Sequence, residues 1–209
     1  MKKMPCLFVR NFSGDGTFTL RPKITPGCEW VRNAGDGFTV VVTVKRDGTA
    51  CAIIGGKLHR RYDAKAGKNP PDGAIPCEES RDPVTGHWPL WVLVGDGPQD
   101  RYHREAWERM PAEDRVDGSY ELCGPHFQGN PERLAVDTLI PHGEAVHFVP
   151  GSDELPATSD AQVFEYFRRW LADLPHEGFV LYKEGPKSVG TVAMCKIRRN
   201  DFGYPWGNR

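Results

Sequence analysis

A lysine stands directly after an apolar, β-branched run, at a position where a lysine side chain can act as a nucleophile. The run covers residues 38–44 (FTVVVTV), and the motif that follows is Lys45-Arg46-Asp47-Gly48-Thr49. A lysine attacks phosphorus only as the neutral amine, and burial and nearby cations both disfavour its charged form. A Lys-x-Asp-Gly motif also arises by chance, so a solvated lysine in a hairpin turn is the alternative interpretation of the motif taken alone.

Two charged segments near the end of the chain contain groups that suit the same chemistry. Glu177 opens the apolar segment Glu177-Gly178-Phe179-Val180, where a carboxylate can hold a divalent metal against a phosphate. Lys196 and Arg198 alternate along a second segment, so a strand would place both on one face, where they can bind a phosphate and stabilise developing charge. A polar turn and a charged edge strand are the corresponding alternatives.

Two further segments contain groups that could bind a nucleotide or nucleic acid. Residues 57–65 (KLHRRYDAK) are the densest basic stretch, and we expect Lys57, Arg60 and Lys65 to contact an RNA backbone. Glu121, in the segment 120–124 (YELCG), can accept a hydrogen bond from a ribose hydroxyl. A solvated basic loop and a surface carboxylate are the alternatives for these two segments.

The order of these segments is more informative than any one of them. Taken together, the series resembles the covalent nucleotidyltransferase superfamily, which comprises nucleic-acid ligases and messenger-RNA capping enzymes. More narrowly, the chain from about Thr43 onward is similar to the small RNA ligase family that includes the vertebrate 5′-to-3′ RNA ligase. The quoted residues are 45–49 (KRDGT), 121–126 (ELCGPH), 129–131 (GNP), 139–143 (LIPHG), 177–180 (EGFV) and 200–206 (NDFGYPW).

The resemblance implies an ATP-dependent RNA ligase that joins 5′-phosphate and 3′-hydroxyl RNA ends. Lys45 would carry AMP covalently, and Mg²⁺ or Mn²⁺ would be held by Glu177 and Glu121. Arg198 stands where the family has a second lysine, which keeps the charge but changes the donor geometry. The residues implied to contact the nucleotide are Val44, Arg61, Glu121, Phe148, which would stack on the base, Glu177, Lys196 and Arg198.

Many short strands and few helices predict an α+β fold, which the resemblance narrows to a nucleotidyltransferase (ATP-grasp-like ligase) catalytic domain. Its antiparallel sheets would flank an ATP cleft. Asp47-Gly48 is typical of a hairpin turn, and residues 64–87 are expected to form a long surface loop. The expected elements are a hairpin at 7–20, strands at 38–44, 50–54, 88–94, 118–124, 145–149, 178–182 and 192–197, and helices at 102–110 and from Ser159 to Pro175.

Length and composition narrow the class of protein. The 209 residues, without a visible repeat or linker, predict one domain, 1–209, and the ten residues after Arg199 are too few for a C-terminal OB domain. The net charge of −1 excludes a strong overall field for nucleic acid, so binding must rely on local cations. Six scattered cysteines and the lack of a long apolar run predict reduced thiols, a cytoplasmic location and no membrane span.

Three alternatives to an RNA ligase remain open at this level. A minimal DNA ligase would carry the same motifs, and a non-catalytic module could bind single-stranded RNA through the basic stretch and its aromatic residue. A metal hydrolase is the third, although the seven histidines show no zinc-binding spacing beyond the weak pair Cys123 and His126. No obligate protein partner is inferred.

Overall fold

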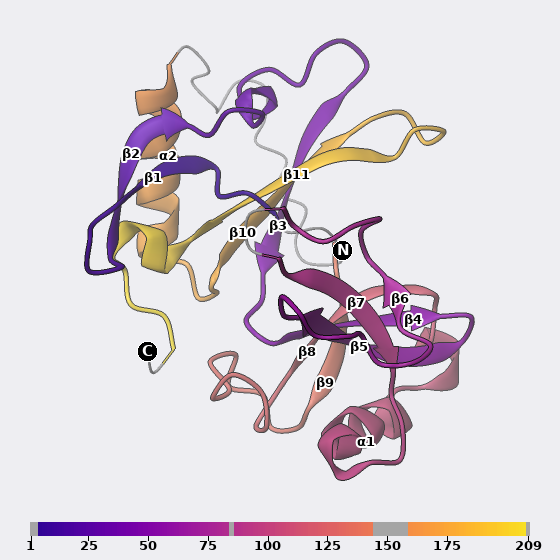
Figure 1. The fold of residues 1–209 in the computed structure, drawn as a ribbon. Coiled ribbons are helices and arrows are strands. Elements are labelled where there is room, and N and C mark those ends of the chain that lie inside the picture. The colour runs from indigo at the N-terminus through magenta and orange to yellow at the C-terminus, as the bar shows by residue number, and fades with distance from the viewer. Residues whose placement is uncertain (1–3, 84–85, 144–158, 208–209) are drawn as a thin grey trace. The chain divides into compact units, whose positions relative to one another are not determined.

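The computed structural model describes residues 4–83, 86–143 and 159–207. Contacts within the chain divide it into two compact units, each treated by itself. The Lys45 unit comprises residues 4–46 and 143–207, and the Glu121 unit comprises residues 47–142. Both units consist mainly of antiparallel strands with one α-helix each among the described residues (Figure 1), which confirms the α+β class. The assignment of the whole chain to a single domain stays a prediction.

The Lys45 unit contains a three-stranded antiparallel sheet in the order β11-β10-β3. Its strands are β3 (Thr39–Lys45), β10 (Gly178–Glu184) and β11 (Thr191–Arg198). The β-branched residues of β3 favour this extended backbone. One face of the sheet is apolar and buried; its side chains are Val42, Phe179, Leu181, Cys195 and Ile197.

A helix and a hairpin cover that apolar face. Helix α2 (Asp160–Ala172) contributes a buried stripe at helical spacing, and the hairpin pairs β1 (Phe8–Phe12) with β2 (Phe18–Ile24). Figure 1 shows α2 lying alongside the hairpin. The shared core therefore fixes β10 and β11 from one side. The buried residues of the helix and hairpin are Leu7, Phe8, Ile24, Val163, Phe167 and Leu171.

The predicted start of α2 is confirmed by a side-chain cap. The Ser159 hydroxyl accepts a hydrogen bond from the Gln162 N–H at 3.3 Å. The helix ends at Ala172, earlier than the predicted stop at Pro175. Proline disfavours helical backbone in the residue before it, so the last turn ends before it reaches that position.

The Glu121 unit contains a six-stranded antiparallel sheet in the order β6-β7-β5-β4-β8-β9. Helix α1 (Arg101–Arg109) packs on one face over a core that includes Cys51, Tyr120 and Leu122. The strands are β4 (Thr49–Ile54), β5 (Lys57–Ala64), β6 (Ile75–Pro76), β7 (Trp88–Leu93), β8 (Gly118–Cys123) and β9 (Thr138–Pro141). Short 3₁₀ turns occupy Glu29–Val31, Pro98–Asp100, Ala112–Asp114 and Arg199–Phe202.

The prediction of a hairpin turn at Asp47-Gly48 is wrong. Strand β3 pairs with β10, whereas β4 pairs with β5 and β8, so these two consecutive strands belong to different sheets. The true hairpin turn is Gly55-Gly56, where both residues have the positive φ that a tight two-residue turn requires. Residues 57–64 of the basic stretch accordingly form strand β5 in the interior of the sheet, not a solvated loop.

The segment 64–87, expected as a surface loop, includes the two-residue strand β6 and is held by one arginine. Arg81 donates hydrogen bonds to the carbonyl oxygens of Lys65 and Gly86, each at 3.1 Å, and to that of Lys68 at 2.5 Å. The predicted strand at 145–149 lies outside the described residues. Strand β9 was missed because its apolar run, Leu139-Ile140, is too short for a period-two pattern.

All six cysteines lie in the described part of the chain, and four of them, Cys28, Cys51, Cys123 and Cys195, are buried. Burial raises the pKa of the Cys51 thiol far above its usual value, so this group behaves as a small apolar core residue. Among the described helices, none has the length and apolar character needed to cross a membrane.

Candidate functional site

The central strand of the Lys45 unit aligns the charged residues predicted from three separate motifs. Lys45 on β3 and Arg198 on β11 both pair with Gly178 of β10, one from each side. One step along, Thr43 and Lys196 flank Val180 in the same way. Side chains at paired positions point to the same face of a sheet. Lys45, Lys196 and Arg198 therefore share the face opposite the core, which is called the cationic face below, and the predicted alternation of Lys196 and Arg198 is confirmed.

Gly178 lies between two of these cations because only glycine fits there. A Cβ atom at this position would lie 2.1 Å from the Ile197 carbonyl oxygen and 2.7 Å from the Arg198 Cα. The glycine of the Glu-Gly-Phe-Val motif thus permits a close approach of β10 and β11. It also leaves the face between Lys45 and Arg198 clear of an intervening side chain.

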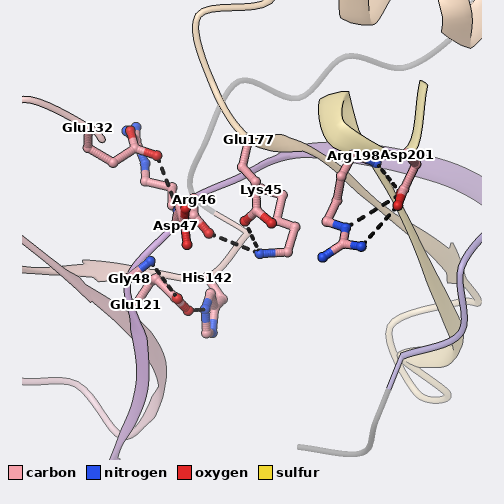
Figure 2. Close-up of polar contacts among 10 residues, drawn as sticks. All are labelled: Lys45, Arg46, Asp47, Gly48, Glu121, Glu132, His142, Glu177, Arg198 and Asp201. Atoms are coloured by element: carbon pink, nitrogen blue, oxygen red, sulfur yellow. Dashed lines mark hydrogen bonds and ion pairs between the residues drawn. The ribbon is translucent and has the colours of Figure 1, made fainter. Parts of the chain in front are cut away.

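Glu177 contacts the candidate nucleophile directly. The Lys45 Nζ donates hydrogen bonds to Glu177 Oε2 and, at 3.1 Å, to the Arg46 carbonyl oxygen (Figure 2). Their side chains are only 19% and 10% exposed, so the ion pair is largely shielded from water. The sequence predicted a carboxylate near a phosphate site, but not its contact with the lysine.

Lys196 is a charged group held at an energetic cost. Burial lowers its pKa, and the nearby charges of Lys45 and Arg198 lower it further, while Glu177 acts in the opposite sense. A cation that is disfavoured in this way is stabilised by any anion that arrives at the cationic face. The electrostatics of the face therefore favour a polyanionic ligand such as a nucleotide phosphate.

Asp201 fixes the position of Arg198, and sequence reasoning missed this residue. Its Oδ1 accepts hydrogen bonds from Arg198 Nη2 at 2.9 Å and from Arg10 Nη2 at 2.7 Å. Its Oδ2 accepts one from the Arg198 backbone N–H at 2.9 Å (Figure 2). The Asp201 side chain is fully buried. Only the tail 200–206, noted as part of the resemblance, pointed to this segment.

In the Glu121 unit, Glu121 binds the backbone of Gly48, just before β4. Glu121 Oε1 accepts the Gly48 N–H at 3.0 Å, and Oε2 lies 2.9 Å from His142 Nε2 (Figure 2). A Cβ on Gly48 would lie 2.3 Å from the Leu122 carbonyl oxygen, so the backbone at this position fits against β8 only with glycine. The contact of His142 with Glu121 was not predicted from the sequence.

The basic residues of β5 point in different directions. Ala52 of β4 pairs with His59 of β5 on one side and with Ser119 of β8 on the other, so these three side chains share a face of the sheet. Arg61 lies two residues after His59, and Glu121 lies two residues after Ser119, so Arg61 and Glu121 share that same face. Arg61 Nε also binds Asp63 Oδ1 at 3.0 Å.

The residues expected to contact RNA are not brought together. Arg60 points to the opposite face, where its Nε binds the buried Asp100 at 2.6 Å. Lys57 and Lys65 are exposed at the two ends of the strand.

Two predicted nucleotide contacts have no supporting geometry. Val44 pairs with Phe179, on the face of β3 opposite to Lys45. Phe148 lies outside the described residues. Within the described ranges, no three histidine, cysteine, aspartate or glutamate side chains are grouped in a way that could hold a metal ion on their own.

Comparison with known proteins adds no assignment. No protein-family model matches the chain, and no curated protein matches it. The family therefore stays a prediction from the motifs and their order.

Proposed function

We propose that this protein is an ATP-dependent RNA ligase in which Lys45 carries AMP. One observation carries the proposal. The fold of the Lys45 unit brings together charged residues from separate motifs: Lys45, Glu177, Lys196 and Arg198. Lys45 and Glu177 are separated by 132 positions, yet they form an ion pair, and β11, on the other side of β10, places Lys196 and Arg198 on the same face as Lys45. An ion pair with a purely structural role would need only Lys45 and Glu177. Burial and nearby cations disfavour the charged form of Lys196, so its presence points to an anionic ligand.

In the proposed first step, the neutral Lys45 amine attacks the α-phosphorus of ATP. An N–P bond forms, the bond from the α-phosphorus to the bridging oxygen breaks, and pyrophosphate leaves with that oxygen. Lys196 and Arg198 would neutralise the charge on the phosphate oxygens, which is the main task of a protein in such transfers. Asp201 keeps Arg198 oriented for this role.

Glu177 connects metal binding to activation of the lysine. Mg²⁺ is commonly held by one or two carboxylates together with substrate phosphates, and the oxygen ligands of Glu177 fit that pattern. The metal would supply Lewis-acid stabilisation of the phosphate. The same carboxylate accepts a hydrogen bond from the Lys45 Nζ, so a Glu177 engaged with a metal would release the Lys45 side chain from this contact.

The later steps transfer AMP and seal the ends. AMP passes from Lys45 to the 5′-phosphate of RNA, and a 3′-hydroxyl then attacks that activated phosphate and releases AMP. We assign Glu121 and Arg61 to the nucleotide, as the resemblance implies. Glu121 and Arg61 share one face of the sheet in the Glu121 unit, which supports assigning both to the same ligand.

The test is covalent labelling with ATP carrying ³²P at the α-phosphate, in the presence of Mg²⁺. Wild-type protein should acquire an acid-labile label, while Lys45→Arg, which keeps the charge and the contact with Glu177 but offers no neutral amine, should acquire at least about 100-fold less. Lys183→Arg, a lysine of the same sheet, is the matched control and should label normally. Labelled Lys45→Arg protein would show that another residue is the nucleophile.

The same preparation distinguishes the alternatives. A non-catalytic RNA-binding module would acquire no label although it binds RNA. A DNA ligase would seal nicked or paired DNA ends faster than matched RNA ends, whereas the proposed function predicts faster sealing of RNA. Labelled GTP in place of ATP tests the choice of nucleotide.

A further inference from the structure

A second group of oriented side chains lies in the Glu121 unit and has no role in the proposed chemistry. Asp137 is buried and accepts two hydrogen bonds from His126, one from the backbone N–H at 3.1 Å and one at Nδ1 at 2.7 Å. The His126 side chain is 42% exposed, whereas that of Asp137 is 2% exposed. Among the described residues, His126 Nε2 has no hydrogen-bond partner. The buried carboxylate thus fixes the orientation of a ring that faces solvent.

The imidazole is part of a stack of planar groups. Tyr102 of α1 lies parallel to His126, with ring centroids 3.6 Å apart and an angle of 10° between the planes. The guanidinium of Arg101 lies 5.4 Å from the centre of the Tyr102 ring. Tyr102 therefore covers one face of the imidazole, while 42% of the His126 side chain stays exposed to solvent.

The backbone around His126 is strained and well fixed. Gln128, Asn130 and Arg133 are the only non-glycine residues of the described chain with positive φ. Such conformations cost of order 1–3 kcal/mol each and gather at functional sites. The Asn130 amide makes two hydrogen bonds to the Leu134 backbone, each 2.9 Å, so the segment is not a loose connection.

We propose that the Tyr102–His126 stack is a platform on which a nucleobase of single-stranded RNA stacks. The identity of the polymer rests on the proposed function. Proteins hold single strands by stacking bases on aromatic rings and guanidinium planes, and a ring fixed in advance loses little entropy on binding. The Asp137 contact and the parallel Tyr102 ring both fix the plane of His126, which stacking requires.

A contact to phosphate through Nε2 explains the arrangement less well. A single hydrogen bond to phosphate requires the edge of the imidazole but not a parallel aromatic ring beneath it. The two possibilities differ in their response to substitution: a stacking platform tolerates another aromatic ring at position 126, while a phosphate contact does not. They differ also in salt dependence, because only a phosphate contact releases counterions.

The experiment measures binding of a fluorescent, 5′-phosphorylated single-stranded RNA of about 12 nucleotides by anisotropy, without ATP or metal. His126→Ala should weaken binding about 5-fold or more, as loss of one stacked base predicts. His126→Phe should stay within about 3-fold of wild type, and so should Tyr102→Phe, the matched control that keeps the ring. The salt dependence should be the same in all four proteins.

Three results would overturn the inference: unchanged affinity in His126→Ala, loss of affinity in His126→Phe together with a shallower salt dependence, and no RNA binding by the wild type. Thermal melting checks that each variant is folded. If His126→Ala does not fold, Tyr102→Leu against Tyr102→Phe makes the same comparison with the Asp137 contact intact. Because binding is measured without ATP, failure of covalent labelling would count against the proposed function alone.

Discussion

At the scale of single residues, the cationic face places charge where folding alone would not favour it. Lys196 is partly buried beside Lys45 and Arg198, and burial is the main reason that its pKa is lowered. Groups kept in such surroundings are characteristic of functional sites, which sacrifice stability for activity. The ion pair of Lys45 with Glu177 neutralises only part of this charge.

Replacing Lys196 with methionine should therefore separate stability from activity. At neutral pH the variant should melt at a higher temperature than wild type, because the cost of the buried charge is gone. The Lys196 amine binds its proton more tightly in the unfolded state than in the folded state, because folding lowers its pKa. Wild-type stability should therefore rise as the pH increases from the pKa of Lys196 in the folded state toward its unfolded value of about 10.4. The stability difference should then shrink across that alkaline range.

Adenylation of Lys196→Met should fall about 100-fold, the usual effect of removing one group that stabilises transition-state charge. Lys187→Met, an exposed lysine of the same unit, is the control and should change neither property. A variant that is less stable at neutral pH would show that Lys196 contributes to packing rather than to a ligand site.

At the scale of elements, the site depends on how closely β10 approaches β11. The Glu-Gly-Phe-Val motif starts the central strand, and its glycine permits the backbone contact that aligns Lys45 with Arg198. The sheet, not the loops, therefore sets the spacing of the cations. Asp201 fastens the end of β11 through hydrogen bonds from the backbone and the guanidinium of Arg198 and from the guanidinium of Arg10.

Gly178→Ala should lower the free energy of unfolding by about 1–3 kcal/mol or more, because the added methyl group would overlap the Ile197 carbonyl. Adenylation should fall as the strands separate and the cations lose their alignment. Denaturant unfolding followed by circular dichroism measures the first effect. Gly14→Ala is the control, since nothing lies within 4 Å of a Cβ there, and it should unfold like wild type.

The sequence predicted the elements that have their own local pattern. Local patterns predict the β-branched run of β3, the capped start of α2 and the alternation in β11. Separate motifs also point to Lys45, Glu177, Lys196 and Arg198, but not to the way the sheet brings them together. Pairing between distant strands could not be predicted from pattern alone. For this reason Asp47-Gly48 was misassigned as a hairpin turn, although β3 and β4 belong to different sheets.

The missed contacts are mostly between residues far apart in sequence. Asp201 binds Arg10, 191 positions away, as well as the nearby Arg198, and His142 binds Glu121, 21 positions away. The contacts with Arg10 and Glu121 have no spacing that a helix or strand period would reveal. Arg60 shows the converse: its basic segment predicted a ligand contact, yet it forms an ion pair with the buried Asp100, which only the fold brings into reach.

At the scale of the whole molecule, charge is balanced and cannot attract nucleic acid from a distance. The chain has 27 basic and 28 acidic residues. Affinity for a polyanion must then come from a few local cations and from stacking, which is independent of charge. Of the cations described here, Lys45, Lys196 and Arg198 share one face, and Arg61 lies on a face with Glu121.

This balance predicts a shallow salt dependence of RNA binding. If about four cations each neutralise one phosphate of a single strand, the logarithm of the association constant should fall with a slope of about −3 against the logarithm of salt concentration. Anisotropy titrations between about 50 and 300 mM salt measure this slope. Lys196→Met should make it shallower by about 0.7, while Lys187→Met should leave it unchanged. A slope steeper than about −5 would require more phosphate contacts than these two faces offer, and would place the main RNA-binding surface elsewhere on the protein.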